Sequence, residues 1–151
     1  MDKPRLLSDL KQAEGFRREA YKDTKGFWTA GYGHFLDQSK DWAGITFDQS
    51  TIDNWLSSDV DKAQGNAQFL VEWPAMDSDA RQNALVELVF NMGIGTWRQF
   101  ALTRTALAHR QWQMAYNGLL ESKWAREVQP NGFTKPGRAT RIATYVLTGQ
   151  F

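Results

Sequence analysis

The chain of 151 residues is long enough for one compact unit or for two lobes that share a core. Its hydrophobic content of 42% and charged content of 23% are ordinary for a soluble globular protein. The absence of cysteine excludes disulfides and thiolate metal sites, and the two isolated histidines argue against a zinc centre. No apolar run approaches the ~18–20 residues that a membrane-spanning helix requires.

The net charge of +1 conceals an uneven distribution along the chain. Residues 1–97 contain 10 Lys and Arg against 15 Asp and Glu, whereas residues 98–151 contain 8 against 2. A basic C-terminal part can attract an anionic polymer through long-range electrostatics that salt weakens. Segregation of charge between two lobes explains the same pattern without a partner, and the sequence leaves both interpretations open.

The first third of the chain predicts a helix followed by a small sheet. In residues 4–13, proline suits a first turn and three leucines share one face, which predicts a helix. Residues 15–36 are rich in Phe, Tyr, Trp and Thr and are punctuated by glycines, which predicts antiparallel strands with tight turns. We expect the hairpin tip at Lys25-Gly26 and a polar linker over residues 37–45.

The remainder of the chain predicts helices. Thr46 to Gln49 has the form of a capping box, and apolar residues follow at helical spacing to about residue 69. After a break at Trp73-Pro74, residues 77–92 predict a central, largely apolar helix, with Gly93 as its stop signal. Further helices are expected at about 97–108, 111–124 and 136–147.

These patterns define an α+β fold class that is mostly helical. We expect a single domain over residues 1–151, with a small N-terminal antiparallel β-sheet lobe at about 15–60. A larger helical lobe would comprise about 1–14 and 61–151.

Three side chains between residues 14 and 29 form a candidate catalytic group. Glu14 lies at the expected end of the first helix beside aromatic residues, where partial desolvation would let its carboxyl keep a proton near neutral pH. Asp23 lies in a polar turn, where it is expected to stay ionised, and the hydroxyl of Thr29 is suited to holding a water beside it. Cleavage of a glycosidic bond requires two carboxyl groups in different protonation states.

Each of the three residues also has an ordinary structural explanation. A glutamate at a helix end is commonly solvated, an aspartate in a turn commonly forms an Asx-turn, and a threonine in a strand fits its β-propensity. Spacing alone therefore does not decide between a glycosidase and a structural arrangement.

Three segments resemble the Glu–Asp–Thr signature of the T-even phage type of lysozyme (endolysin, glycoside hydrolase family 24). They are Glu14-Gly-Phe-Arg, Tyr21-Lys-Asp-Thr-Lys-Gly and Trp28-Thr-Ala-Gly-Tyr-Gly-His34. Downstream, Leu88-Val-Phe-Asn-Met-Gly93 resembles the central helix of that family, and Arg138-Ala-Thr-Arg141 resembles its last segment. The similarity covers nearly the whole chain and implies a lysozyme-like fold.

The resemblance implies an enzyme, a muramidase that hydrolyses the β-1,4 bond between N-acetylmuramic acid and N-acetylglucosamine in bacterial peptidoglycan. It assigns Glu14 as the general acid. Asp23 would position or activate the attacking water, and Thr29 would help to hold that water. The resemblance implies no metal and no cofactor. Members of the family invert the anomeric carbon, so the two carboxyls are expected to lie about 6.5–9.5 Å apart.

The resemblance also suggests residues that contact the substrate. Phe35, Phe90 and Asn91 match positions that line the saccharide cleft of the family, where aromatic rings cover sugar faces and amides bind N-acetyl groups. Trp28 is adjacent to Thr29 and is the tryptophan best placed to join them. Three other tryptophans lie on predicted helical faces and are expected in the core: Trp97, Trp112 and Trp124.

Two further pairings follow from the resemblance. Arg138 matches an arginine that pairs with the catalytic glutamate, an interaction that favours the ionised carboxylate and so opposes the effect of burial. His34 would form a fold-stabilising ion pair with Asp59. The segment 128–135 is longer than in the family and adds a loop ahead of Arg138.

The family implies a bacteriophage protein that acts on peptidoglycan glycan strands and lyses the host at the end of infection. The N-terminal segment lacks the apolar stretch of a signal peptide. We therefore expect a monomer that is made in the host cytoplasm and depends on a holin to reach the periplasm and cell wall. No nucleic-acid partner and no stable membrane insertion are expected.

Three alternatives remain open at this point. A lytic transglycosylase or chitinase-like glycosidase would share the acid, but a transglycosylase needs no water-holding carboxylate, so Asp23 and Thr29 favour hydrolysis. A non-catalytic cell-wall-binding or phage structural module would keep the fold without the chemistry. Finally, the basic C-terminal helices could disrupt membranes without any reaction.

Overall fold

The computed structural model describes residues 1–129 and 137–151, and the chain forms two compact units. The smaller unit comprises Pro4–Lys62, and the larger comprises Met1–Lys3 and Ala63–Phe151. The division falls within the helix α2 (Gln49–Gln68). None of the helices in the described ranges is long and apolar enough to cross a membrane.

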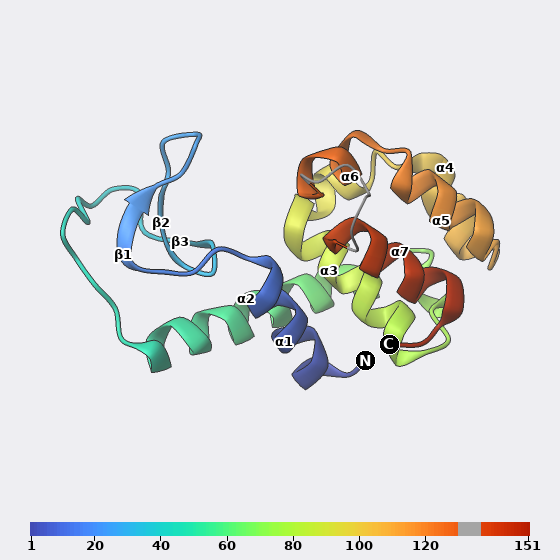
Figure 1. Ribbon diagram of the computed structural model, residues 1–151, viewed down its shortest axis with the longest axis horizontal. Coiled ribbons are helices and arrows are strands. Elements are labelled where there is room, and N and C mark those ends of the chain that lie inside the picture. Colours follow the sequence, from blue (N-terminus) through green and yellow to red (C-terminus); the bar gives the residue numbers. More distant parts are fainter. Residues whose placement is uncertain (130–136) are drawn as a thin grey trace. The chain divides into compact units, whose positions relative to one another are not determined.

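The smaller unit carries the expected N-terminal helix and antiparallel sheet (Figure 1). Helix α1 (Lys3–Ala13) precedes three strands, and the sheet order is β1-β2-β3 with both pairings antiparallel. The strands are β1 (Arg17–Lys22), β2 (Trp28–Gly31) and β3 (His34–Phe35). The turn between β1 and β2 contains the predicted hairpin tip.

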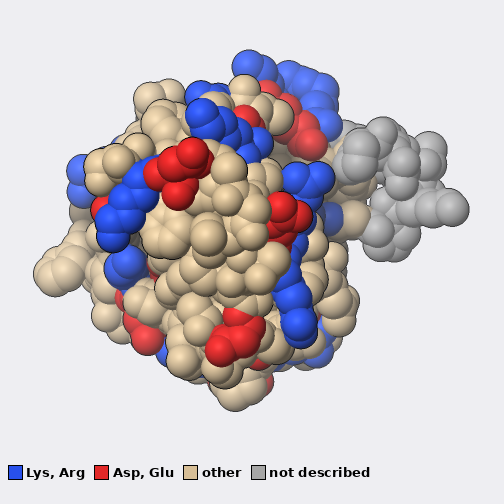
Figure 2. Space-filling view, turned by 90° about the vertical axis from the view of Figure 1, so that its left-hand side faces the viewer, with Lys and Arg blue, Asp and Glu red and all other residues tan. Residues whose placement is uncertain are grey.

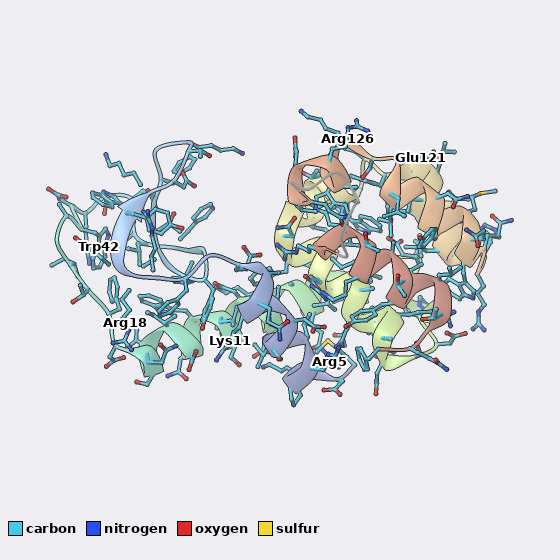
Figure 3. The ribbon with its side chains drawn as sticks, viewed as in Figure 1. Arg5, Lys11, Arg18, Trp42, Glu121 and Arg126 are labelled. Carbon is cyan, nitrogen blue, oxygen red and sulfur yellow. The ribbon has the colours of Figure 1, made fainter. Side chains whose placement is uncertain are left out.

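One face of this sheet packs on a small aromatic core. Ala20, Ala30 and Leu36 are buried there, and four partly buried aromatic side chains cover them: Trp28, Trp42, Phe47 and Trp55. Trp42 lies in the connection between β3 and α2 (Figure 3), where its indole N–H donates to the Asp37 carbonyl at 2.8 Å.

Helix α2 packs closely on β2 because glycine occupies position 31. A Cβ atom at Gly31 would lie 2.8 Å from Cγ2 of Ile52, and the φ of +64° also favours glycine.

The capping box predicted at Thr46 is wrong. Helix α2 begins at Gln49, and the carboxylate of Asp48 accepts a hydrogen bond from the Thr51 N–H at 2.8 Å, while Thr46 forms a β-bridge with Glu19. The bond from the Thr51 N–H lowers the pKa of Asp48. Aspartate caps a helix as well as threonine does, and its charge suits the positive helix end, so the aspartate two residues later takes the role.

The larger unit is helical in its described residues. A 3-10 turn, η1 (Trp73–Ala75), precedes the central helix α3 (Asp79–Trp97) and four further helices. These are α4 (Ala101–Ala108), α5 (Trp112–Leu120), α6 (Lys123–Val128) and α7 (Arg138–Thr148). Helix α7 packs against α3 and α5, and α4 packs against α5 (Figure 1).

The central helix is interrupted at Gly93 as predicted, because the backbone there is non-helical at φ 79° and ψ 153°. A further helical stretch then runs on to Trp97, so that α3 consists of two parts joined at a kink. One predicted helix differs from those observed. The helix predicted over 111–124 is two helices, because the Ser122 hydroxyl accepts from the Ala125 N–H at 3.1 Å and starts α6. The predicted start at Pro136, and most of the added loop over 128–135, lie outside the described residues.

The core prediction for the tryptophans is confirmed at two of three positions. Trp97 and Trp124 are buried, whereas Trp112 is partly exposed and carries the Arg81 guanidinium 4.0 Å from its ring centre.

Candidate active site

Asp23 lies at the start of the turn between β1 and β2 and holds that turn closed. Its Oδ1 accepts hydrogen bonds from the N–H groups of Lys25 and Phe27, each at 2.9 Å. The backbone adds two bonds of 2.9 Å, from the Asp23 N–H to the Phe27 carbonyl and from the Gly26 N–H to the Asp23 carbonyl. Both side-chain bonds end on Oδ1, so turn formation does not require Oδ2.

Thr29 lies in the middle of the sheet and is 2% exposed. Its register partners are Tyr21 on β1 and Phe35 on β3. The Thr29 hydroxyl donates to the Phe27 carbonyl at 3.0 Å. With its hydrogen engaged there, Oγ1 would meet a water as an acceptor.

The backbone of Phe27 therefore links Asp23 to Thr29, since it bonds to both side chains. Sequence reasoning missed this residue because the contacts use main-chain atoms, which any residue type supplies.

Glu14 follows the last residue of α1 and is half-buried. Its N–H donates to the Leu10 carbonyl at 2.8 Å, so it continues the last turn of the helix. Lys11, labelled on α1 in Figure 3, forms an ion pair of 2.8 Å with Asp53 of α2. Glu14, Asp23 and Thr29 all belong to the smaller unit.

The predicted pairing of His34 with Asp59 is observed as a direct side-chain contact. Nδ1 of His34 lies 2.7 Å from Oδ2 of Asp59, and the imidazole stacks on Trp55 with ring centres 4.6 Å apart. The pair joins β3 to α2 and so fixes the strand that follows the candidate catalytic residues.

Phe35 and Trp28 occupy different environments in the sheet. Phe35 is 64% exposed, and its ring centre lies 5.9 Å from that of Phe27. Trp28 packs against the small core with the Lys22 ammonium 5.2 Å from its ring centre. Because neighbouring strand residues point to opposite faces, Trp28 and Thr29 lie on opposite faces of the sheet.

Phe90 and Asn91 lie on α3 in the larger unit and are half-buried. The Trp124 indole N–H donates to Oδ1 of Asn91 at 2.7 Å. This bond fixes the orientation of the amide and leaves its NH2 group as the hydrogen-bond donor.

Arg138 is the first residue of α7, and its Nε donates to Oε1 of Glu87 at 2.9 Å. Glu87, on α3, is 1% exposed and also accepts hydrogen bonds from Arg141. Sequence reasoning did not single out Glu87, because it lies within an apolar stretch of the central helix. Among residues 1–129 and 137–151, no group of three or more His, Asp or Glu is arranged to hold a metal ion.

A mostly helical fold with a small N-terminal antiparallel sheet is a lysozyme-like α+β architecture. A family model described as phage lysozyme matches residues 11–141. The chain therefore belongs to the phage lysozyme family.

Similar proteins differ greatly in length from one another. The chain is 33% identical to the peptidoglycan hydrolase gp36 of Pseudomonas phage phiKMV over 77% of its own length, which is 13% of that protein. It is 26% identical to the pre-baseplate central spike protein Gp5 of Enterobacteria phage T4, over 93% of this chain and 27% of that one. It is 24% identical to the probable T4-type lysozyme 1 of Dictyostelium discoideum, over 93% of this chain and 92% of that protein. The chain thus spans a small part of the first two relatives and nearly all of the third.

Proposed function

We propose that the chain is a muramidase of the endolysin type, which hydrolyses the β-1,4 bond between N-acetylmuramic acid and N-acetylglucosamine in peptidoglycan. The observation that carries the proposal is the hairpin in which one backbone segment binds both Asp23 and Thr29. The family match over residues 11–141 supports it.

In the proposed reaction, Glu14 donates its proton to the leaving glycosidic oxygen. Oδ2 of Asp23 accepts a proton from a water that Oγ1 of Thr29 also holds, and the water oxygen attacks the anomeric carbon from the opposite face. The C–O bond to the leaving sugar breaks as the new C–O bond forms, so the configuration inverts. No cofactor takes part in any of these steps.

We assign the saccharide contacts to four residues. The exposed ring of Phe35 and the ring of Phe90 are suited to sugar faces, and the Asn91 NH2 group is suited to an N-acetyl carbonyl. Arg138 completes the proposed substrate-binding set. Trp28, which the sequence also suggested, packs against the small core on the opposite face of the sheet from Thr29, so we do not retain it.

Product analysis tests the reaction. Purified peptidoglycan is digested with wild type and with Glu14→Gln, and the fragments are identified by mass spectrometry. We expect hydrated reducing ends from wild type, and at least a ~100-fold lower rate from the variant because the acid is lost. The first anomer released, measured before mutarotation, should be inverted.

Each rival predicts a different result. Products with 1,6-anhydro ends would identify a lytic transglycosylase, and cleavage of chitin oligomers alone would identify a chitinase-like glycosidase. Equal clearing of walls by wild type and Glu14→Gln would identify a non-catalytic module, and leakage of liposomes by both would identify membrane disruption.

The biological setting is also a proposal. We propose a monomer that is released from the host cytoplasm through a holin and lyses the host late in infection. The lengths of two relatives support a second setting, in which the same chemistry belongs to a larger particle protein. Mass spectrometry of purified phage particles separates the two, because only the second setting retains the protein in the particle.

A further inference from the structure

Two carboxylates are almost fully buried in the larger unit, and they are paired differently. Glu72, which is 0% exposed, accepts from Nε and Nη2 of Arg104 at 2.8 and 3.1 Å and from the Trp97 indole at 2.7 Å. Burial of a carboxylate is costly unless it is paired and hydrogen-bonded, and here one arginine balances one carboxylate. This cluster holds η1, α3 and α4 together.

Glu87 instead binds two arginines, and it binds them in different ways. Arg141 donates Nη1 to Oε2 at 2.9 Å and Nη2 to Oε1 at 2.8 Å, which is the paired geometry of a strong guanidinium–carboxylate contact. Arg138 donates its Nε to Oε1 at 2.9 Å. This bond restrains the Arg138 side chain at Nε, whereas Arg141 is held through both of its terminal nitrogens.

The first turn of α7 is held in place independently of Glu87. Oε1 of Gln129 accepts from the N–H and the hydroxyl of Thr140, at 3.0 and 2.9 Å. A Cβ atom at position 137 would lie 2.9 Å from Cγ of Gln129, so Gly137 permits this close approach. The backbone that carries Arg138 is therefore fixed by one contact and its guanidinium by another.

The position of the two arginines is unfavourable by local rules. Arg138 and Arg141 lie in the first turn of α7, which contains no acidic residue and has no side-chain cap at Gly137. Cations at a helix N-terminus oppose the helix dipole. Such conflicts between local preference and observed residue concentrate at functional sites.

We propose that Glu87 is a positioning residue that holds the guanidinium of Arg138 in the orientation needed for substrate binding. Arg141 binds both oxygens of the buried Glu87 carboxyl group and so holds it in place. This inference rests on the proposed function, which includes Arg138 in the substrate-binding set.

The test compares Glu87→Gln with the matched control Glu72→Gln. Both variants keep the side-chain shape, and both remove one buried carboxylate that binds arginine. Thermal midpoints are measured first, and kcat and KM for soluble peptidoglycan oligosaccharides are then measured well below both midpoints. We expect kcat/KM to fall about tenfold in Glu87→Gln and less than about twofold in Glu72→Gln. Glu87→Asp, which restores the carboxylate, should recover part of the loss.

A double variant separates positioning from general stability. If Glu87 acts through Arg138, adding Glu87→Gln to Arg138→Gln should lower kcat/KM by less than about twofold further. The inference would be overturned if the losses of kcat/KM in the two single variants multiplied in the double variant. It would also be overturned if Glu87→Gln retained at least half of the wild-type kcat/KM.

Two further results would also decide between the proposals. If Glu87→Gln does not fold at the assay temperature, Glu87→Asp replaces it, with an expected loss of at least about threefold; a smaller loss overturns the inference. Full activity of Glu14→Gln would overturn the proposed function instead, whatever the Glu87 variants do.

Discussion

At the scale of single residues, Asp23 combines two properties that the sequence left as alternatives. It forms the Asx-type turn that is common for aspartate, and it remains the candidate catalytic carboxylate. Both are possible because the turn uses Oδ1 only, so Oδ2 is available for chemistry. A structural explanation and a functional one therefore need not exclude each other at this position.

Two substitutions of Asp23 separate these properties. Asparagine keeps an acceptor at Oδ1, so we expect the thermal midpoint to stay within about 2 °C of wild type, while wall-degrading activity falls at least ~100-fold with the lost charge. Alanine removes both side-chain bonds, which is expected to lower the midpoint by about 3–6 °C. Calorimetry and the decay of wall turbidity measure the two effects. Full activity in Asp23→Asn would remove Asp23 from the mechanism.

At the scale of elements, the ion pair between α1 and α2 supports the helix that ends beside Glu14. The hydrogen bond from Lys11 lowers the pKa of Asp53, and the bond to Asp53 raises the pKa of Lys11 above 10.5. The stabilisation is therefore complete above the ordinary aspartate pKa and is lost as the pH falls through the lowered pKa of Asp53. It is also lost as the pH rises through the raised pKa of Lys11.

Asp53→Asn should consequently destabilise the protein over a defined range of pH. Because both side chains are 40% exposed, we expect only about 0.5 kcal/mol, or about 1–2 °C, between about pH 5 and pH 9. The difference should disappear near pH 2, as followed by thermal unfolding. In a Lys11→Met background the same substitution should have no effect; an undiminished effect there would show that Asp53 acts through another partner.

The sequence predicted those elements whose signals are local. Leucine spacing in α1 and the glycine in the turn at Lys25-Gly26 predicted the first helix and the hairpin, because each pattern lies within a few residues. The predicted helix over 111–124 was wrong because the apolar pattern continues through Ser122, where a side-chain cap starts a new helix.

The residues of the candidate site were likewise predicted only where the sequence carries a local signal. Asp23 and Thr29 were identified from a short motif, whereas Glu87 was not. Its contact with Arg138 joins residues 51 positions apart, and a lone glutamate in an apolar stretch carries no local sign of its partner. Phe27 was missed for a different reason, since its contribution comes from its backbone.

At the scale of the whole molecule, the charge asymmetry leads to a prediction about the proposed binding to cell walls. On the face drawn in Figure 2, Lys and Arg are interspersed with Asp and Glu, so that face presents no large area of one sign. The excess of basic residues belongs to positions 98–151, where Lys123 and Arg126 are exposed on α6.

We expect binding to purified walls to weaken with salt. In cosedimentation of the inactive Glu14→Gln protein, the bound fraction should fall severalfold between about 0.05 M and about 0.5 M NaCl. Adding Lys123→Gln and Arg126→Gln should weaken binding at low salt more than the matched pair Lys40→Gln and Lys62→Gln. Binding that does not respond to salt would favour simple segregation of charge between lobes.

The backbone of Phe27 has a consequence for spectroscopy. Its amide proton is held by the Asp23 carboxylate, so it should exchange with deuterium more slowly than the exposed amides around it. Protection at this single amide therefore reports, without any label or substrate, whether the hairpin is closed. Variants with substitutions elsewhere in the chain can be screened by the NMR signal of the Phe27 amide, before any rate of wall degradation is measured.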